Sequence, residues 1–386
     1  MTSLVVALVA AAPWVVVPPL AMLRVARSRS LSDVDDVPPS SAALVSVIVP
    51  ARNEARNIER CVRSILSTRY GPMELIVVND HSTDDTADIA IRAASGDGRF
   101  RLLSSPDLPN GWFGKQWACA TGASAASGRM LLFTDADTAH APDLLPRAVN
   151  LLLHDQDELL SVVGRQEMHT FWERLLQPQV FWILITRYGG TESVSNARHA
   201  EDVIANGQFL LVRRDAYDAV GGHEAVRDKV AEDLALAQRF HRHGRRVRLV
   251  RGDDQLSTHM YGSLPELIAG WGKNVFAGGI DAMPGGAAGR LLFPFVLPIA
   301  PLVALVPVVV FAFALAGMIP FAWSVWAAIC TAANLLWWAL IYRGFHQRLW
   351  YALLAPLGAT IVLFIVVRAI ARGRRVGWKG REYVAR

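Results

Sequence analysis

Two aspartates, Asp135 and Asp137, stand two positions apart directly after the apolar run Met130 to Phe133. Four apolar residues are too few for a helix and are typical of a short buried strand. In an extended chain, side chains two positions apart point to the same side, so the two carboxylates would repel each other unless a cation lies beside them. A hard divalent ion suits such oxygens, and Mg²⁺ typically takes one or two protein carboxylates together with substrate phosphates. The alternative reading is that both aspartates only cap a turn.

Polar side chains also follow two earlier predicted strands, at the point where each strand ends. Arg-Asn-Glu at 52–54 follows the apolar segment 45–50, and Asn-Asp at 79–80 follows the segment 74–78. The carboxyl ends of parallel strands meet at one edge of a sheet, where ligands of open α/β sheets bind, so we expect these clusters to lie near the aspartate pair. No Gly-x-Gly-x-x-Gly follows the first strand and no Walker-type Gly-Lys-Ser/Thr occurs, which argues against a dinucleotide site and a P-loop.

The elements that position these clusters alternate between strand and helix, judged from the spacing of their apolar residues. Strands are expected at 45–50, 74–78, 100–103, 130–134, 203–212 and 246–250, and helices at 58–66, 115–126, 171–188, 232–240 and 264–276. The helix at 171–188 is too short and too polar to span a membrane and is expected in the core or at a membrane interface. The alternation predicts an α/β fold with a mostly parallel sheet and helices on both faces.

The N-terminal end of the chain is strongly apolar, in a sequence whose hydrophobic content is 52%. As a helix, the stretch 4–23 just spans a bilayer core of roughly 30 Å. No basic segment precedes it, so an uncleaved anchor is expected rather than a signal peptide. Arg24, Arg27 and Arg29 follow the stretch and place the next residues in the cytoplasm.

Three further apolar stretches lie near the C-terminus, at 291–315, 320–342 and 349–367. Three crossings would put the basic tail opposite the catalytic domain, against the positive-inside rule. One stretch is therefore expected to be re-entrant or interfacial, and the first, with its four prolines, is the candidate. The predicted organisation is a transmembrane anchor over 1–23, a linker over 24–43, a cytoplasmic domain over 44–275, a transmembrane region over 291–370 and a basic tail over 371–386. This describes a multi-pass protein of the cell membrane.

The net charge of +5 is concentrated in the segment 372–386, which holds six Arg or Lys residues and one Glu. The balanced charge of the remaining chain argues against nucleic acid as a partner and favours a tail that lies on anionic lipid headgroups. The three cysteines, Cys61, Cys119 and Cys330, have neither metal-site nor redox spacing. They fit a reduced compartment in which they act as small apolar residues.

Five segments between residues 44 and 275 together resemble the family 2 glycosyltransferases with a GT-A fold. They are Val-Ile-Val-Pro-Ala-Arg-Asn-Glu at 47–54, Val-Val-Asn-Asp-His-Ser-Thr-Asp at 77–84, Gly-Lys with a small-residue helix at 114–128, Thr-Asp-Ala-Asp at 134–137 and Gly-Gly…Glu-Asp-Leu at 221–234. Each is weak alone, but five in this order and spacing are specific. Two longer segments, at 108–118 and 171–178, look like the membrane-bound subgroup that glycosylates carotenoids or hopanoid-type lipids.

The resemblance implies a donor site for a nucleotide-diphosphate sugar. Glu54 and Asp80 would contact the base, where a carboxylate can accept from an imide N–H, and Lys115 would lie near the phosphates. The family's usual first Asp is Asn79 here, which leaves that contact to Asp80. The implied set is Pro50, Arg52, Glu54, Asp80, Lys115 and Asp135. The structural alternatives are a helix-start charge for Glu54, a turn former for Asp80 and a solvated lysine for Lys115.

The resemblance also implies the catalytic groups. Asp135 and Asp137 would hold Mg²⁺ or Mn²⁺ against the diphosphate, where the metal neutralises charge on the leaving group. Asp233 would be the general base that takes the acceptor proton, and Glu232 could exchange roles with it. The structural alternative for Asp233 is a helix N-cap, a position that Asp favours.

The predicted reaction is transfer of one hexose from a UDP- or GDP-sugar to a hydroxyl or carboxyl group of an apolar, membrane-embedded acceptor, with inversion. Processive synthases of this family carry Arg-Trp after the catalytic acid, whereas Gly270 precedes Trp271 here, which disfavours a polymerising enzyme. Three alternatives remain open: a polyprenyl-phosphate sugar transferase, a processive polysaccharide synthase and a non-catalytic membrane scaffold.

Overall fold

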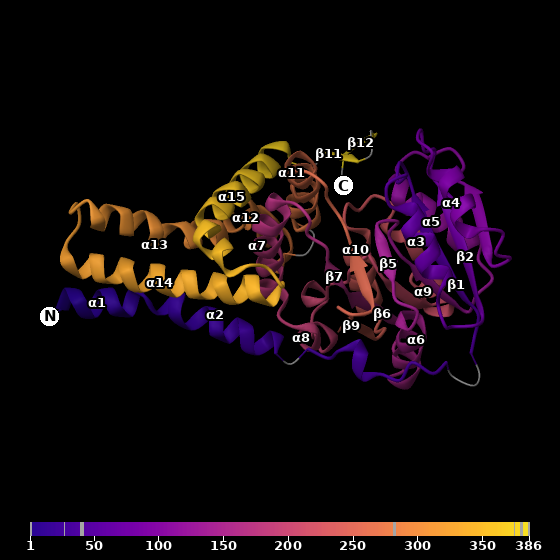
Figure 1. Cartoon of the computed structure of the whole chain (residues 1–386), viewed down its shortest axis with the longest axis horizontal. Coiled ribbons are helices and arrows are strands. Elements are labelled where there is room, and N and C mark those ends of the chain that lie inside the picture. Colours follow the sequence, from indigo (N-terminus) through magenta and orange to yellow (C-terminus); the bar gives the residue numbers. More distant parts are fainter. Residues whose placement is uncertain are drawn as a thin grey trace.

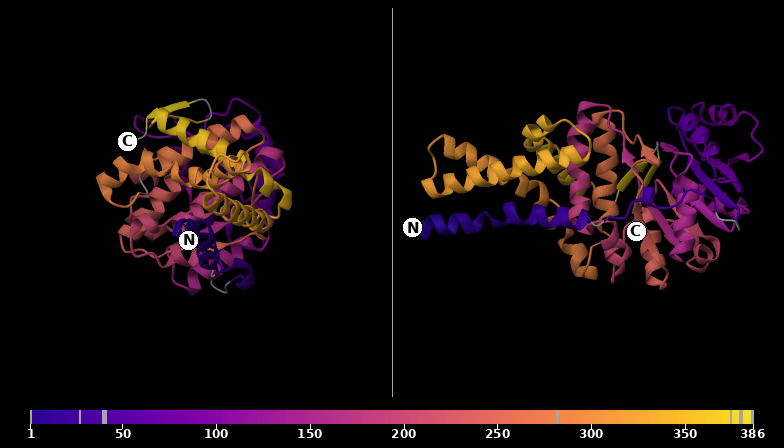
Figure 2. Two further views of the ribbon diagram at one scale, coloured as in Figure 1. Left: turned by 90° about the vertical axis from the view of Figure 1, so that its left-hand side faces the viewer. Right: turned by 60° about the horizontal axis from the view of Figure 1, so that its bottom comes forward.

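The computed structural model describes residues 2–26, 28–38, 42–280, 283–373, 375–378 and 381–384. Arg27 and residues 39–41 of the expected linker lie outside the described residues. The chain has an α/β part, formed by the middle of the sequence, and a bundle of long helices from both ends of the sequence that extends away from it (Figure 1). The same separation is visible from a second direction in Figure 2.

A seven-stranded sheet with the order β3-β2-β1-β4-β8-β6-β9 forms the centre of the α/β part. Its strands are β1 (Val45–Ala51), β2 (Met73–Asn79), β3 (Phe100–Ser104), β4 (Met130–Phe133), β6 (Leu159–Val163), β8 (Leu210–Arg213) and β9 (Val247–Arg251). Strand β8 is antiparallel to both of its neighbours, and the other neighbouring pairs are parallel. The sheet is therefore mixed. The strand predicted at 203–212 was too long, and β6 was not predicted.

Helices cover both faces of this sheet, as predicted. Against one face lie α3 (Ile58–Leu66), α4 (Thr86–Ala94) and α6 (Leu144–His154), and against the other lie α5 (Gly114–Ala125), α9 (Arg214–Ala219) and α10 (Glu232–Arg242). Alternate residues of a strand point to opposite faces, so Val47 of β1 belongs to the first core and Ile48 to the second. Central strands that are buried on both faces have nearly continuous apolar sequences, which explains why the sequence predicted β1, β2 and β4.

Smaller elements complete the α/β part. A three-stranded sheet contains β5 (Thr138–His140), β10 (Leu256–Thr258) and β7 (Arg165–Gln166), and the short helices are η1 (Leu31–Asp33), α8 (Thr191–Ser195), η2 (Ala200–Asp202), η3 (Gly222–Val226) and η4 (Asn274–Gly278). Strand β5 begins directly after the loop that holds Asp135 and Asp137, and it pairs with β10. This pairing fixes the far end of the loop.

Among the described residues, four helical segments are long and apolar enough to cross a membrane: Ser3–Val25, Gly286–Leu315, Phe321–Gly344 and Leu349–Arg372. They comprise α1 (Thr2–Ala10), α2 (Ala12–Val25), α12 (Gly286–Val296), α13 (Ile299–Leu315), α14 (Phe321–Gly344), η6 (Leu349–Leu354) and α15 (Ala355–Arg372). Helices α1, α13 and α14 lie side by side at the far end of the bundle (Figure 1). Trp14 of α2 joins them, since its Nε1 donates to the Val303 carbonyl oxygen (3.0 Å). These long apolar helices indicate association with a membrane.

The segment of α15 is the most buried of the apolar segments, and the helix packs on the α/β part. It contacts α7 (Phe171–Tyr188) and α11 (Leu264–Lys273). Helix α14 also reaches α7, since the Tyr342 hydroxyl donates to the Leu175 carbonyl oxygen (2.8 Å). Gln179 of α7 donates from Nε2 to the Ala355 carbonyl oxygen (3.1 Å), and a Cβ added at Gly358 would lie 2.1 Å from the same Nε2. The buried share of the apolar window is 39% for α15 and 11% for the N-terminal segment. The first part of α7, up to Val180, is therefore largely buried in the protein, whereas residues 181–188 are partly exposed.

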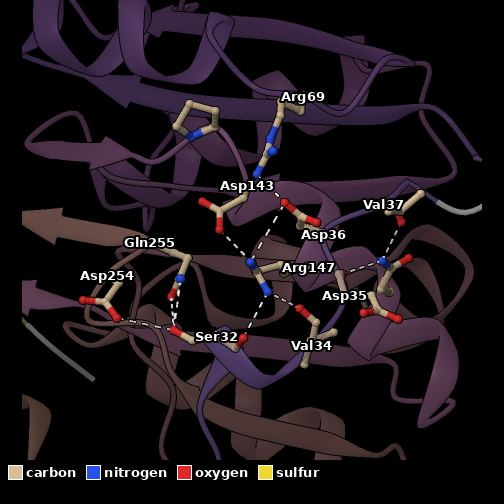
Figure 3. Close-up of polar contacts among 12 residues, drawn as sticks. Ser32, Val34, Asp35, Asp36, Val37, Arg69, Asp143, Arg147, Asp254 and Gln255 are labelled. Carbon is tan, nitrogen blue, oxygen red and sulfur yellow. Dashed lines mark hydrogen bonds and ion pairs between the residues drawn. The ribbon is translucent and has the colours of Figure 1, made fainter.

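The segment that links α2 to the sheet is bound to the α/β part. Arg147 of α6 donates from Nη1 to the Ser32 carbonyl oxygen (3.1 Å; Figure 3). Asn150 of the same helix donates from Nδ2 to the carbonyl oxygens of Asp35 and Val37 (2.7 and 2.8 Å). These backbone contacts hold the first apolar helix at a fixed position relative to the sheet.

After α15 the chain returns to the α/β part as an antiparallel hairpin of β11 (Arg375–Trp378) and β12 (Arg381–Val384). Arg381 Nη1 lies 2.7 Å from Asp80 Oδ2, and the Gly114 backbone N–H donates to the Tyr383 hydroxyl (3.2 Å). The expectation that the tail lies on lipid headgroups is therefore wrong for Arg381, because a buried carboxylate of the α/β part already pairs its charge.

Candidate active site

A buried polar network holds the loop that carries Asp135 and Asp137. Thr134 Oγ1 donates to the Gln208 carbonyl oxygen (2.7 Å) and lies 3.0 Å from His140 Nε2. Thr138 Oγ1 donates to the Asp135 carbonyl oxygen (2.8 Å). Burial lowers the pKa of His140 to about 3, so its imidazole is neutral at physiological pH. The network fixes both aspartates at the carboxyl end of β4, the edge of the sheet that the sequence predicted.

Lys115 connects this loop to α10. Its Nζ lies 2.7 Å from Asp135 Oδ1 and 2.6 Å from Glu232 Oε1. Burial alone would lower the pKa of Lys115, but the carboxylates around it outweigh burial and raise the pKa well above its ordinary value. Lys115 is therefore a firmly charged cation in the site, and its reading as a solvated surface lysine is wrong.

The adjacent acids Glu232 and Asp233 have different environments. Burial alone would raise the pKa of Glu232, but Lys115 outweighs burial and lowers it. Burial and the charge of Glu232 raise the pKa of Asp233 to about 6. The backbone N–H groups of Gly207 and Leu234 donate to the two Asp233 oxygens (both 2.7 Å). Of the two acids, Asp233 is therefore the one that can take up a proton near neutral pH.

These groups line a cavity of about 10 Å³, the size of a single water molecule. Its polar lining consists of Lys115, Thr134, Asp135, His223, Glu232 and Asp233, with Pro50 and Gly207 among its other residues. The structure thus brings Pro50, Lys115, Asp135 and both candidate catalytic acids together. His223 is held in place by Tyr217 (hydroxyl to Nδ1, 2.9 Å), and burial lowers its pKa to about 4.

Asp80 and Arg52 lie at the end of β2 and β1. Arg52 Nη1 donates to the Asp80 backbone carbonyl oxygen (2.7 Å) and lies 3.9 Å from Asp80 Oδ2. Asp80 is only 1% exposed, and its Oδ1 is buried without a hydrogen-bond partner. Asn79 forms the turn, since its Oδ1 accepts from the Ser82 N–H (3.2 Å). A buried carboxylate oxygen without a donor is available for a donor group of a ligand.

Glu54 is bound at the start of α3 and acts electrostatically on the aspartate pair. Its backbone N–H donates to Thr86 Oγ1 (2.8 Å), and its Oε2 accepts from Asn57 Nδ2 (3.0 Å). Its charge is also one of those that raise the pKa of Asp137. Glu54 therefore adds a third negative charge to the neighbourhood of Asp135 and Asp137.

The aspartate pair fits a divalent cation. Asp137 Oδ1 is buried and has no hydrogen-bond partner. Burial, then the charges of Asp135 and Glu54, raise the pKa of Asp137 well above its ordinary value. No group of three or more His, Cys, Asp or Glu side chains among the described residues is arranged to hold a metal by itself. A cation here would therefore take its remaining ligands from substrate phosphates or water, which is the mode of binding that Mg²⁺ prefers.

Three residues of the site were not predicted. Lys273, the last residue of α11, lines a second cavity of about 30 Å³ together with Lys115 and Glu232, and Tyr383 lines the same cavity. Arg381 contacts Asp80, as described above. For Lys273, its position two residues after Trp271 was the one sequence feature that could have pointed to the site. Nothing in the sequence relates residues 381 and 383 to the sheet.

The sequence profile of Glycosyl transferase family 2 matches residues 46–221. The 4,4'-diaponeurosporenoate glycosyltransferase of Staphylococcus haemolyticus (strain JCSC1435) is 25% identical over 62% of this chain and 63% of its own length, and that of Staphylococcus aureus (strain USA300) is 28% identical over the same shares. The chain thus spans less than two thirds of these curated relatives.

One solved structure matches nearly the whole chain. The mannosyltransferase PcManGT from Pyrobaculum calidifontis, in complex with GDP-Man and Mn²⁺, superposes with a TM-score of 0.57 and 20% identity, over 96% of this chain and 98% of its own. This likeness concerns the fold and extends to the apolar helices. By its sequence profile, its relatives and its GT-A-like mixed sheet, the chain belongs to glycosyl transferase family 2.

Proposed function

We propose that the protein transfers one hexose from a UDP- or GDP-sugar to an apolar acceptor held in the membrane, such as a carotenoid or hopanoid-type lipid. One observation carries the proposal. Lys115 joins Asp135 to Glu232 at a cavity that Pro50 and Asp233 also line. The charged groups that we assign to donor binding and to catalysis therefore lie together at the carboxyl edge of the sheet.

The donor would extend along this edge. Its base would meet Asp80, whose buried Oδ1 lacks a donor, next to Arg52. Its diphosphate would meet the cations Lys115 and Lys273, which line the same cavity. The structural neighbour was solved with GDP-Man, a ligand of this chemical class.

Asp135 and Asp137 would hold Mg²⁺ or Mn²⁺. When bound, the metal would act as a Lewis acid that neutralises charge on the departing diphosphate. The structural neighbour with GDP-Man was solved with Mn²⁺. In this chain, the buried and unpartnered Oδ1 of Asp137 supports the assignment.

The chemical step would be a direct displacement. The acceptor oxygen attacks the anomeric carbon, the bond from that carbon to the diphosphate oxygen breaks, and the configuration inverts. Asp233 takes the proton of the acceptor hydroxyl as the hydroxyl oxygen bonds to the anomeric carbon. Lys115 keeps Glu232 ionised, so Glu232 orients the Lys115 ammonium group rather than accepting the proton. A carboxylate acceptor would need no base, so Asp233 favours a hydroxyl.

The acceptor would reach the site from the membrane. We expect α1–α2, α13 and α14 to cross it, with the α/β part in the cytoplasm and α15 lying at the interface against α7 and α11. With these three crossings, one N-terminal and two C-terminal, the hairpin β11–β12 lies on the same side of the membrane as Asp80. This agrees with the contact between Arg381 and Asp80. Arg24, Arg343 and Arg348 then also lie inside, in agreement with the positive-inside rule. In this arrangement the non-crossing segment would be α15, whereas the sequence favoured the proline-rich segment.

The alternatives are separated by their products. A polyprenyl-phosphate sugar transferase would yield a lipid-linked sugar that is labile to mild acid, and a processive synthase would yield a polymer. The missing Arg before Trp271 no longer argues against a synthase, because Lys273 brings a cation from the same helix to the cavity. A non-catalytic scaffold would tolerate loss of Asp233.

Mass spectrometry of lipids tests the proposal directly. Lipid extracts from cells with and without the gene should differ by a lipid heavier than its precursor by one hexose. Cells that produce the Asp233→Asn variant should resemble cells without the gene. Identical lipid profiles together with a new polysaccharide would refute single transfer to a lipid.

A further inference from the structure

We propose that the C-terminal hairpin β11–β12 occupies the donor site as an internal mimic of the nucleotide sugar and must leave before the donor binds. The inference rests on the proposed function. It assigns a regulatory role to the chain's last residues, which follow α15 directly and lie outside the part matched by the family profile.

The first contact is made by Arg381 to the carboxylate expected to bind the base. Its Nη1 donates to Asp80 Oδ2 (2.7 Å), and its side chain is 21% exposed while that of Asp80 is 1% exposed. A charge-assisted hydrogen bond to a buried carboxylate is among the stronger polar contacts in proteins. Asp80 Oδ1 has no hydrogen-bond partner but is buried, so a ligand could donate to this carboxylate only after the guanidinium has moved.

The second contact is made by Tyr383 at the start of α5. Its ring stacks on Phe113 with the centroids 4.4 Å apart, and its hydroxyl oxygen accepts from the Gly114 N–H (3.2 Å). Backbone N–H groups at the start of a helix bind anionic oxygens, phosphates in particular, and Lys115 is the next residue. The hydroxyl oxygen thus takes up an N–H that could otherwise face a phosphate.

Arg381 and Tyr383 together offer what a nucleotide diphosphate would offer. The guanidinium supplies N–H donors to Asp80 in place of the base, and the hydroxyl supplies an oxygen to the start of α5 in place of a phosphate. The aromatic ring of Tyr383 adds a stacking contact with Phe113. Two separate contacts of matching chemistry, from one short hairpin, are what a mimic requires.

The remaining space excludes simultaneous binding. The cavities at Lys115 measure about 10 and 30 Å³, and Tyr383 lines the larger one. Ligand pockets generally enclose several hundred Å³, about 300 or more. With the hairpin docked, the site holds water but no nucleotide sugar.

The hairpin is also tethered close to its site. Helix α15 ends at Arg372 and β11 begins at Arg375, so a displaced hairpin stays near the donor site. A short tether gives the competing segment a high effective concentration. The apparent association constant for the donor is then the intrinsic constant multiplied by the fraction of molecules in which the site is open.

Calorimetric titration of the full-length protein in detergent tests this competition, with UDP and GDP as probes in the presence of Mn²⁺. Arg381→Ala should tighten the Kd of the bound nucleotide about three- to tenfold, because it raises the open fraction. Deletion of 375–386 should tighten it at least as much. Arg375→Ala is the matched control, since it removes an exposed charge from the same hairpin, and should leave Kd unchanged.

A second readout follows the hairpin itself. Saturating nucleotide should speed the removal of the C-terminal residues by trypsin, measured by intact mass, if binding releases the hairpin. Unchanged or weaker nucleotide binding in Arg381→Ala and in the deletion would overturn the inference while leaving the proposed function intact. If neither nucleotide binds to any form, the donor site itself is refuted and the mimic with it.

Discussion

Lys115 Nζ lies 2.6 Å from Glu232 Oε1, and this ion pair distinguishes two acids that are neighbours in sequence. Glu232 has a cation in contact and stays ionised, whereas burial and the charge of Glu232 raise the pKa of Asp233. A general base works best when its pKa lies near the operating pH. The ion pair therefore supports the proposal that Asp233 is the proton acceptor.

The pH dependence of kcat/KM should report Asp233. Its pKa is raised to about 6, and only the ionised form accepts a proton. The activity should therefore be nearly constant above about pH 7 and fall about tenfold per pH unit well below pH 6. A profile of kcat/KM from pH 5 to 8 measures this, and a curve that stays level down to pH 5 would contradict the assignment.

Asp137→Ala should abolish divalent-dependent binding of the donor. Asp137 Oδ1 is buried without a partner, and removing the carboxylate removes a ligand for the cation. Asp135→Ala should have a smaller effect, because it also frees Lys115. Nucleotide-sugar titrations in Mn²⁺, Mg²⁺ or EDTA measure the donor affinity of each variant. Asp218→Ala, which removes an exposed carboxylate of α9, serves as the control. Equal wild-type affinity in Mn²⁺ and in EDTA would refute the metal site.

Lys273 should act on the departing diphosphate. Lys273→Met removes a cation beside Lys115 and Glu232, and removing one preorganised group that stabilises developing charge typically costs about 10²-fold in kcat. Lys273→Arg should restore much of the rate, since it keeps the charge. Steady-state kinetics that separate kcat from KM measure the effect. A Lys273→Met variant with wild-type kcat would show that the residue is only structural.

The membrane arrangement can be mapped by single engineered cysteines, because Cys61, Cys119 and Cys330 are buried. In intact cells an impermeant thiol reagent should label Met318→Cys, between α13 and α14. It should not label Asp107→Cys in the α/β part or Arg375→Cys in the hairpin until the cells are permeabilised. Labelling of Arg375→Cys from outside would mean that α15 crosses the membrane and that the hairpin cannot contact Asp80.

Much of the sheet and of the acidic side of the site could be predicted from the sequence. Strands β1, β2 and β4 are buried on both faces and therefore have continuous apolar sequences. Asp80, Asp135 and Asp137 follow β2 and β4 directly, so parallel strands bring them to one edge. Strand β6 was not predicted although Leu159–Val163 is a short, mostly apolar segment like that of β4, and β8 was predicted too long because apolar residues also precede it.

The parts that could not be predicted depend on contacts between distant residues. Arg381 and Asp80 are separated by 301 positions, and no local pattern relates them. Hydropathy marks the segment of α15 as apolar enough to cross a membrane, but it does not report that the helix also packs on protein neighbours. Its packing on α7 and α11 depends on the close approach of Gly358 to Gln179, which only the assembled structure contains.

The central claim, transfer of a hexose with Asp233 as base, is tested most directly by sugar transfer in vitro. Purified wild-type protein and the Asp233→Asn variant are incubated with radiolabelled UDP- or GDP-hexose, Mn²⁺ and lipids extracted from cells that lack the gene. Wild type should move label into the lipid fraction, and Asp233→Asn should do so about 10²- to 10⁴-fold more slowly with unchanged donor affinity. Glu232→Gln, which leaves Lys115 paired with Asp135, should lose less of the transfer rate than Asp233→Asn. Equal rates of labelling by wild type and Asp233→Asn, or a lipid fraction that stays unlabelled with every donor, would contradict the account.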